Sequence, residues 1–204
     1  MKFLSCEECE PFMESVMPKN GFLLEFGVYK ANTLKRLADM ARKVNNPFTK
    51  ILGFDSWNGL PKEAPGLPSH PDWPEGAFSL INDFKLDGEK NAIKFVENHM
   101  NDYNDILELY SGFFDQTLTE SLGKRLENSG SYIHIDCDLY LSSVTALNWL
   151  FKYRVPKVYS IIRYDDWIST AYNAGQRLAH RQIEQKYEID FMQLSENVFM
   201  VRSY

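Results

Sequence analysis

Short apolar runs alternate along the chain with stretches in which apolar residues recur every three or four positions. The first pattern is typical of buried strands and the second of amphipathic helices. Strands are predicted at residues 21–27, 50–55, 105–110, 131–138, 157–166, 187–194 and 197–203. Helices are predicted at residues 33–44, 87–100, 118–126, 144–151 and 171–186. Side chains at Asn32 or Thr33, and at Ser142 or Ser143, are expected to cap two of these helices.

The order of the predicted elements indicates the class of fold. Strands that alternate with helices predict right-handed parallel crossovers, and therefore an α/β protein with a doubly wound, mostly parallel sheet. Only the short link "SEN" separates the last two strands, which predicts a C-terminal antiparallel hairpin. Residues 1–20 precede the first strand, and we expect them to form a short helical cap on one domain spanning residues 21–204.

A proline-rich loop interrupts this pattern after the second strand. Five of the nine prolines lie between Pro61 and Pro74, a density that neither a helix nor a strand tolerates. A long irregular loop inside a compact domain is usually a lid, a binding loop or a disordered segment. Trp73 and Phe78 give this loop aromatic side chains with which to contact the domain, so we favour a lid.

The composition excludes several classes of partner. The 204 residues carry a net charge of −6 and no basic run, which argues against a nucleic-acid backbone as the main partner. No apolar run reaches the ~20 residues of a membrane helix, and the first residues lack the apolar centre of a signal peptide. We expect a soluble, cytoplasmic protein with no membrane partner. Its three cysteines suit a reducing compartment, and we interpret Cys6 and Cys9 as an incidental pair.

Carboxylates gather at the predicted C-terminal ends of the strands, which is the edge where open α/β sheets bind ligands. Asp136 and Asp138 end one strand, and Asp165 and Asp166 end the next. Because burying an unpaired charge is costly, these acids lie either at exposed strand ends or beside a cation. Paired acids on neighbouring strands favour the cation. We predict Mg²⁺ on Asp136, Asp165 and Asp166, with Asp138 supporting a ligand or accepting a proton.

The loop after the first strand predicts a nucleoside ligand without a pyrophosphate. Gly27 follows the strand directly and allows a ligand to approach the backbone, but neither GxGxxG nor GxxxxGK[ST] is present. Glu25 stands near the same strand end. Asp55 ends the second strand, where an acid is placed to bind ribose hydroxyls. Trp57 beside it offers a flat face for a purine.

Five segments, "EFGVYKANTLKRLA", "GFDSWNGLP", "HIDCDLYLSSVTAL", "YDDW" and "GQRLAHRQ", together resemble the macrocin O-methyltransferase (TylF-type) family. The resemblance runs from about residue 21 to residue 185. Members are class I methyltransferases that use S-adenosylmethionine. The resemblance therefore implies a seven-stranded, Rossmann-like methyltransferase fold. Family members often place an acceptor lid or an oligomer contact in the N-terminal region, which is short in this sequence. A homodimer is among the expectations.

The resemblance also implies the roles of individual residues. The cofactor-binding residues would be Glu25, Phe26, Gly27, Val28, Tyr29, Thr33, Asp55, Ser56, Trp57, Gly112, Phe113 and Asp136. Of this set, Glu25, Gly27 and Tyr29 would line the methionine end of the cofactor, and Asp55 would hold the ribose. The adenine would be bordered by Ser56, Trp57, Gly112 and Phe113. Asp136, Asp165 and Asp166 would bind Mg²⁺, which in family members orients an acceptor hydroxyl for in-line attack on the methyl group. Asp136 or Asp138 would take the proton.

The sequence departs from the family pattern at two positions near the site. Ala31 stands where family members commonly have glycine, and Trp167 replaces a usual tyrosine. The leading hypothesis is a Mg²⁺-dependent O-methyltransferase acting on a hydroxyl of a small molecule, expected to be a sugar or a glycosylated metabolite. Two alternatives stay open. One is a metal-dependent glycosyltransferase in which "DCD" holds the metal, and the other is a binding module on the same fold without catalysis.

Overall fold

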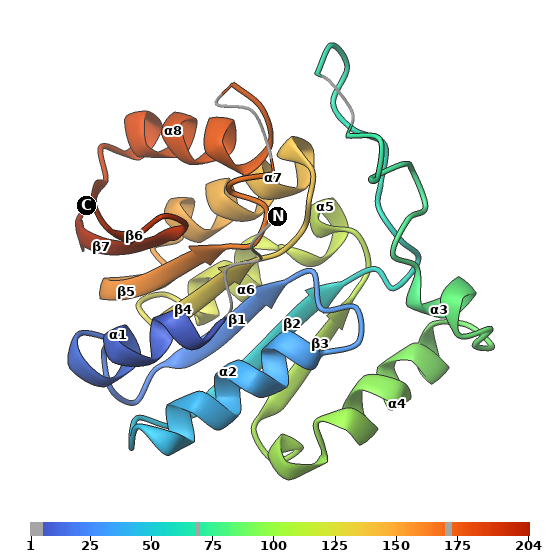
Figure 1. Cartoon of the computed structure of the whole chain (residues 1–204), viewed down its shortest axis with the longest axis horizontal. Helices are drawn as coiled ribbons and strands as arrows, with labels where there is room; N and C mark the ends of the chain where they lie inside the picture. The colour runs from blue at the N-terminus through green and yellow to red at the C-terminus, as the bar shows by residue number, and fades with distance from the viewer. Residues whose placement is uncertain (1–5, 68–69, 170–172) are drawn as a thin grey trace.

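A seven-stranded sheet forms the centre of the computed structural model, which describes residues 6–67, 70–169 and 173–204 (Figure 1). The strand order is β3-β2-β1-β4-β5-β7-β6. β1 to β5 pair in parallel, and β7 is antiparallel to both β5 and β6. The strands are β1 Phe22–Phe26, β2 Lys50–Asp55, β3 Leu107–Ser111, β4 Gly130–Ile135, β5 Pro156–Tyr164, β6 Asp190–Ser195 and β7 Val198–Ser203. The predicted sheet and its C-terminal hairpin are confirmed.

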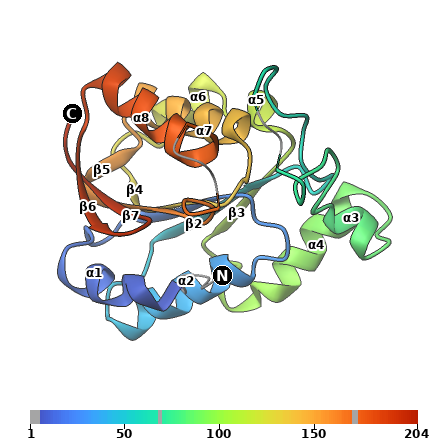
Figure 2. The ribbon, with the colours of Figure 1, turned by 45° about the horizontal axis from the view of Figure 1, so that its top comes forward.

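Helices cover both faces of the sheet, as Figure 2 shows for α1, α2 and α4 below it and α6, α7 and α8 above it. The helices are α1 Glu10–Ser15, α2 Asn32–Lys43, α3 Leu80–Asp83, α4 Glu89–His99, α5 Phe114–Thr117, α6 Glu120–Arg125, α7 Tyr140–Lys152 and α8 Gly175–Tyr187, with 3₁₀ turns η1 Cys6–Cys9 and η2 Asn101–Tyr103. Within the described ranges, no helix combines the length and the apolar character needed to cross a membrane.

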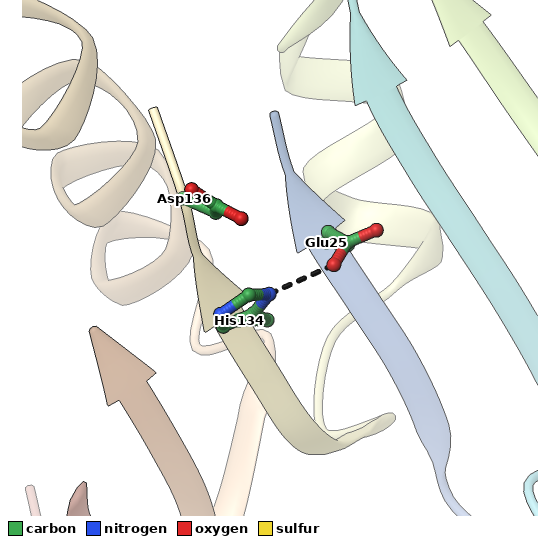
Figure 3. Close-up of side chains that lie close together, drawn as sticks. All are labelled: Glu25, His134 and Asp136. Carbon is green, nitrogen blue, oxygen red and sulfur yellow. Dashed lines mark hydrogen bonds and ion pairs between the residues drawn. The ribbon is translucent and has the colours of Figure 1, made fainter. Parts of the chain in front are cut away.

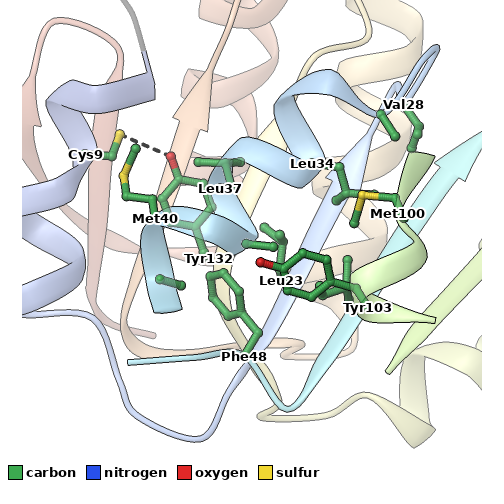
Figure 4. Packing of buried hydrophobic residues seen from close by; sticks show 14 of the residues in the cluster. Cys9, Leu23, Val28, Leu34, Leu37, Met40, Phe48, Met100, Tyr103 and Tyr132 are labelled. Carbon is green, nitrogen blue, oxygen red and sulfur yellow. Dashed lines mark hydrogen bonds between the residues drawn. The ribbon is translucent and has the colours of Figure 1, made fainter. Parts of the chain in front are cut away.

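Two hydrophobic clusters, one on each face, hold these layers together. Because successive side chains of a strand point to opposite faces, Leu23 packs with α2 and α4 (Figure 4) whereas Leu24 packs with α7. The N-terminal segment joins the first cluster through Met13 and Cys9, and the Tyr132 hydroxyl donates to the Cys9 Sγ at 3.1 Å. Cys9 is thus a buried packing residue.

The caps predicted for two helices are wrong. The residue before α2 is Ala31, whose φ is +63°, and neither Asn32 nor Thr33 caps the helix with its side chain. α7 begins at Tyr140, so Ser142 and Ser143 lie inside its first turn and not before it. In both cases the helix starts at or before the polar residue that was expected to precede and cap it.

Two helix boundaries also differ from the predictions. The helix expected at residues 118–126 starts later, at Glu120 of α6, because Thr119 adopts an extended backbone and caps the helix by accepting a hydrogen bond from the Leu122 N–H. The short α5 precedes it and was not predicted. The helix expected at residues 171–186 starts at Gly175, and residues 170–172 lie outside the described part of the chain. Neither difference changes the order of strands and helices.

Replacing Ala31 with glycine is expected to stabilise the fold by ~0.5–1 kcal/mol. A left-handed residue with a Cβ costs about 1–2 kcal/mol, and the greater freedom of glycine in the unfolded chain offsets part of that gain. The expected rise in Tm is ~1–4 °C for a chain of this size. Thermal unfolding of the wild type and Ala31→Gly measures it. A lower Tm for the variant would mean that burial of the Ala31 methyl group outweighs the backbone strain.

Candidate active site

A cavity of about 620 Å³ opens at the C-terminal ends of β1, β2 and β4. Its wall contains most of the residues predicted to bind a cofactor, from four separate segments of the chain. They are Glu25, Gly27, Val28, Tyr29, Thr33, Asp55, Ser56, Gly112, Phe113 and Asp136, and Asp138 lines it as well. The sheet therefore brings together residues that are far apart in the sequence, at the edge where ligands of such sheets bind.

Gly27 fits its position because no side chain is possible there. Its φ is +90°, and an added Cβ would lie 1.7 Å from the Asp136 carbonyl oxygen. The Asp136 N–H also donates to the Phe26 carbonyl at 2.9 Å. The ends of β1 and β4 are therefore in direct contact below the cavity, and the loop that carries Gly27 can pass close to a ligand.

Asp55 fixes the shape of that loop. Its Oδ2 accepts from the backbone N–H groups of Val28 and Tyr29 at 2.8 Å, and its Oδ1 accepts from the Trp57 N–H at 2.6 Å. Burial raises the pKa of Asp55, and these backbone hydrogen bonds oppose that rise. The carboxylate is thus both a wall of the cavity and the link between the ends of β1 and β2.

Glu25 presents one free carboxylate oxygen in the cavity wall. Its Oε1 lies 2.8 Å from His134 Nδ1 (Figure 3), whereas its buried Oε2 has no hydrogen-bond partner among the described residues. Burial raises the pKa of Glu25, and the hydrogen bond with His134 opposes the rise. An unpaired buried carboxylate oxygen is costly, so a cationic ligand group at this point would be stabilised. His134 itself is a buried, hydrogen-bonded residue.

One group of potential metal ligands has its donor atoms close together in the described part of the chain, namely Glu25, His134 and Asp136, within 4.8 Å (Figure 3). Both nitrogens of His134 already have polar partners, because Nδ1 meets Glu25 and Nε2 meets Arg163. This group is therefore better described as a hydrogen-bonded network than as a metal centre. The predicted set of Asp136, Asp165 and Asp166 is not drawn together to that spacing.

The carboxylates at the ends of β4 and β5 nevertheless repel one another. Burial raises the pKa of Asp136, and the charges of Asp165 and Asp166 raise it further. Burial and the charge of Asp136 likewise raise the pKa of Asp138 to about 8. Burial and Asp138 raise the pKa of Asp166. Such mutual repulsion among oxygen ligands fits a site for a hard divalent cation.

Asp165 differs from its neighbours. Burial alone would raise its pKa, but hydrogen bonds and charges of His134 and Arg163 outweigh burial and lower it to about 2. The Arg163 guanidinium, itself buried, donates to Asp165 Oδ1 at 2.9 Å. Asp166 accepts from the Gln176 amide at 3.0 Å. Neither Asp165 nor Asp166 lines the cavity, whereas Asp136 and Asp138 do.

Two residues predicted to bind the cofactor do not line the cavity. The ring of Phe26 stacks on Phe54 in the core, with centroids 4.8 Å apart. Trp57 is fully buried, and its indole N–H donates to the Tyr29 carbonyl at 3.2 Å. The expected flat face for a purine is therefore not available at Trp57, because its backbone turns at a φ of +51° and directs the side chain into the core.

Several cavity residues were not predicted. Leu141, Ser142 and Thr145 line the cavity from the first turns of α7, and Phe78 lines it from a loop. Positions 141, 142 and 145 share one face of the helix that begins shortly after "DCD". This spacing in the sequence could have predicted that they face the site. The loop that carries Phe78 has no periodic pattern in the sequence.

The proline-rich loop contacts the far side of the cavity through Glu63. Its base is closed by hydrogen bonds from Leu60 N–H to the Ala77 carbonyl and from Gly76 N–H to the Leu60 carbonyl, both at 2.9 Å. The two oxygens of Glu63 accept from the N–H groups of Tyr140 and Leu141 at 2.8 and 3.0 Å. A loop side chain therefore caps α7, where the helix dipole favours a carboxylate. Figure 1 shows the loop extending from the body above α3.

Replacing Glu63 with alanine is expected to release the loop from α7 and to cost ~1 kcal/mol of cap stabilisation. The amides of Tyr140 and Leu141 should then exchange with solvent faster, as should residues of the loop. Native-state hydrogen exchange measures both effects. Glu75→Ala, on the exposed side of the same loop, is the control and should leave these amides unchanged. Equal exchange in Glu63→Ala and wild type would contradict the proposed cap.

The parallel sheet, the glycine turn after β1 and the carboxylate after β2 define a Rossmann-like protein of the class I methyltransferase type. The sequence matches the family model described as macrocin-O-methyltransferase (TylF) over residues 7–192, and the chain belongs to that family of O-methyltransferases. No curated protein matches the sequence. The family match favours methyl transfer over the glycosyltransferase alternative.

Solved methyltransferase structures share the fold. The O-methyltransferase NovP is 17% identical with a TM-score of 0.65, and the match covers 97% of this chain and 79% of NovP. The calicheamicin methyltransferase CalS11 is 18% identical with a TM-score of 0.67, over 96% of this chain and 76% of CalS11. SMU.1697c of Streptococcus mutans, solved with S-adenosylhomocysteine (SAH), is 11% identical with a TM-score of 0.52, over 98% and 97% of the two chains. At these identities the likeness establishes the fold.

Proposed function

We propose that this protein transfers a methyl group from S-adenosylmethionine to a hydroxyl of a sugar or glycosylated small molecule, with assistance from Mg²⁺. The observation that carries the proposal is the cavity at the ends of β1, β2 and β4, in a chain of an O-methyltransferase family. Its volume of about 620 Å³ suits a ligand of the size of a nucleoside with an amino-acid side arm.

The cavity offers a complementary group for each part of the cofactor. The free Oε2 of Glu25 would accept from the methionine ammonium, which would satisfy that buried oxygen. Asp55 lines the cavity beside the loop that it holds, and it would accept from a ribose hydroxyl. Ser56, Gly112 and Phe113 would border the adenine. The donor methyl group would then lie near Asp136.

Asp136, Asp165 and Asp166 would be the residues that hold Mg²⁺. The all-oxygen donor set and the mutual repulsion of the carboxylates fit this ion. When bound, the ion would polarise an acceptor hydroxyl and lower its pKa. Asp138 lines the cavity and would accept the proton of the acceptor hydroxyl. The rest of the rate acceleration would come from holding the two substrates close together and correctly oriented.

The sugar class of the acceptor is supported by a structural relative. An apo structure of CalS11 is described as a TDP-rhamnose 3′-O-methyltransferase, with a TM-score of 0.58 and 14% identity to this chain over 96% of its length. The acceptor hydroxyl of this chain would be presented at the carboxylates of β4 and β5.

Calorimetric titration with SAH, with and without Mg²⁺, tests the proposal. We expect one-to-one binding that Glu25→Gln weakens, because the neutral amide loses its attraction for the ammonium group. Asp115→Asn, a cavity-lining change at an exposed acid, is the matched control. Absence of SAH binding under both conditions would overturn the proposal and leave a binding module on the methyltransferase fold.

A further inference from the structure

A buried row of polar side chains crosses three neighbouring strands beside the cavity of about 620 Å³. Glu25 of β1 lies next to His134 of β4 in the parallel register, and His134 lies next to Arg163 of β5. None of the three residues is more than 2% exposed. The preceding row on the same face belongs to the hydrophobic core and consists of Leu23, Tyr132 and Ile161. The core therefore changes from hydrophobic to polar just before the strands end.

Hydrogen bonds within this row fix which atom of His134 faces Glu25. A guanidinium has donors only, so the Arg163 Nη1 donates to His134 Nε2. The hydrogen of the neutral imidazole therefore lies on Nδ1, and a protonated ring would carry a hydrogen there as well. In either state the Nδ1–H group donates to Glu25 Oε1, with 2.8 Å between the two atoms (Figure 3).

The far end of the row holds the His134 ring in place. The same Arg163 Nη1 that donates to His134 also donates to Asp165 Oδ1 at 2.9 Å. Stability does not explain such a buried row, because hydrophobic residues of similar volume commonly give equal or greater stability. Its place beside the cavity instead indicates a role in binding a ligand.

The hydrogen bond from His134 determines which oxygen of Glu25 remains for a ligand. Oε1 is occupied by His134, and the buried Oε2 has no partner among the described residues. The terminal torsion of a glutamate is broad, so a carboxylate without this hydrogen bond would not be held in one orientation. A cationic group would then meet a poorly oriented acceptor, and its hydrogen bond would be weaker.

We propose that His134 is a positioning residue for the methyl donor. By holding Glu25 Oε1, it directs Oε2 toward the ammonium group of S-adenosylmethionine. His134 does not line the cavity, so it acts through Glu25 and touches neither substrate. This inference rests on the proposed function, since it concerns the donor of the same methyl transfer.

Two ligands separate this role from a general effect on the fold. They are SAH and 5′-methylthioadenosine, which shares the adenosine and sulfur of SAH but lacks its ammonium and carboxylate groups. Both are titrated calorimetrically into the wild type, His134→Gln and His134→Asn. The asparagine amide can replace the Nδ1–H group, whereas the longer glutamine reaches the position of Nε2.

We expect His134→Gln to weaken SAH binding roughly tenfold or more, because the Glu25 carboxylate loses the donor that orients it. Binding of 5′-methylthioadenosine should stay close to that of the wild type, since this ligand has no ammonium group. His134→Asn should retain most of the SAH affinity. Adding His134→Gln to Glu25→Gln should cause no further loss of SAH affinity, because the two residues act as one unit.

His180→Gln is the matched control, since it replaces a second buried histidine in the same way. His180 of α8 lines a groove of about 430 Å³ beside Trp167, between α8 and the hairpin of β6 and β7 (Figures 1 and 2). Its Nδ1 lies 2.9 Å from the Tyr164 hydroxyl oxygen, and the groove shares no lining residue with the larger cavity. Both ligands should bind to this variant as they bind to the wild type.

The outcomes bear on His134 and on the proposed function separately. Unchanged or tighter SAH binding by His134→Gln, an equal loss for both ligands, or a further loss in the double variant would overturn the positioning role alone. Equal losses of SAH affinity in the asparagine and glutamine variants would overturn the role of Nδ1. A wild type that binds 5′-methylthioadenosine as tightly as SAH would overturn the contact between Glu25 and the ammonium group, and the role of His134 with it. A wild type that binds neither compound would overturn the proposed function itself and the assignment of His134 that rests on it.

Discussion

Gly27→Ala is expected to abolish SAH binding and to destabilise the fold by more than ~4 kcal/mol. The added methyl group would lie 1.7 Å from the Asp136 carbonyl oxygen, which is backbone and cannot rotate away. The ends of β1 and β4 must then separate, and overpacking of a buried backbone contact is among the few mechanisms that give effects of this size. Urea unfolding and calorimetric titration with SAH measure the two losses.

Gly66→Ala is the matched control for Gly27→Ala. Gly66 has a φ of +83°, similar to the +90° of Gly27, but nothing lies within 4 Å of an added Cβ. It carries the same backbone strain, worth about 1–2 kcal/mol, without the collision. The difference between the two variants therefore isolates the contact with Asp136. Equal stability and equal SAH affinity in the two variants would show that the contact does not matter.

Asp136→Asn is expected to lower methyl transfer at least ~100-fold while raising the stability of the metal-free protein by ~1–2 kcal/mol. The folded pKa of Asp136 is raised by burial and by Asp165, so the ionised carboxylate opposes folding. Below its unfolded pKa of ~3.9 the Asp136 carboxyl is protonated, and its contribution to the free energy of unfolding is fully present. This contribution is lost as the pH rises through the folded pKa. The gain from asparagine should thus be absent in acid and grow above pH ~4. Urea unfolding in EDTA at several pH values checks the sign.

Asp165→Asn, at the end of the neighbouring strand β5, is expected to change the stability in the opposite direction. The pKa of Asp165 is lowered to about 2, because His134 and Arg163 outweigh its burial. Removing its charge weakens an ion pair with a buried guanidinium, and we expect a loss of ~1–2 kcal/mol, since the carboxylate is partly exposed. If both variants changed the stability in the same direction, the opposite pKa directions of the two acids would be wrong.

The hydrophobic pattern was sufficient to predict the sheet and most helices because it follows backbone periodicity. Leu23 and Leu24 illustrate this, since adjacent apolar residues in β1 fill the clusters on the two faces. Capping was not predictable from the same pattern. Asn32 and Ser142 are good capping residues by type, but the turn before α2 uses Ala31 in a left-handed conformation and α7 is capped by Glu63 from a distant loop.

The candidate site was predicted as far as its residues follow strand ends. Glu25, Asp55 and Asp136 lie where the strand order places them, around one cavity. Trp57 shows the limit of this reasoning, because a positive φ directs its side chain into the core and no sequence pattern revealed that turn. Phe78 reaches the cavity from an irregular loop, and the groove beside Trp167 depends on how α8 crosses the hairpin.

The central place of β4 and β5 in the strand order has a consequence for how the two cavities can change. The wall of the larger cavity comes from the ends of β1, β2 and β4 and from neighbouring loops, and the groove beside Trp167 comes from α8 and the strands beyond β5. Substitutions in α8, β6 or β7 can therefore change one half of the molecule while the other half keeps its geometry. Chimeras joined after residue 166 would exchange the lining of the groove and leave most of the wall of the larger cavity unchanged.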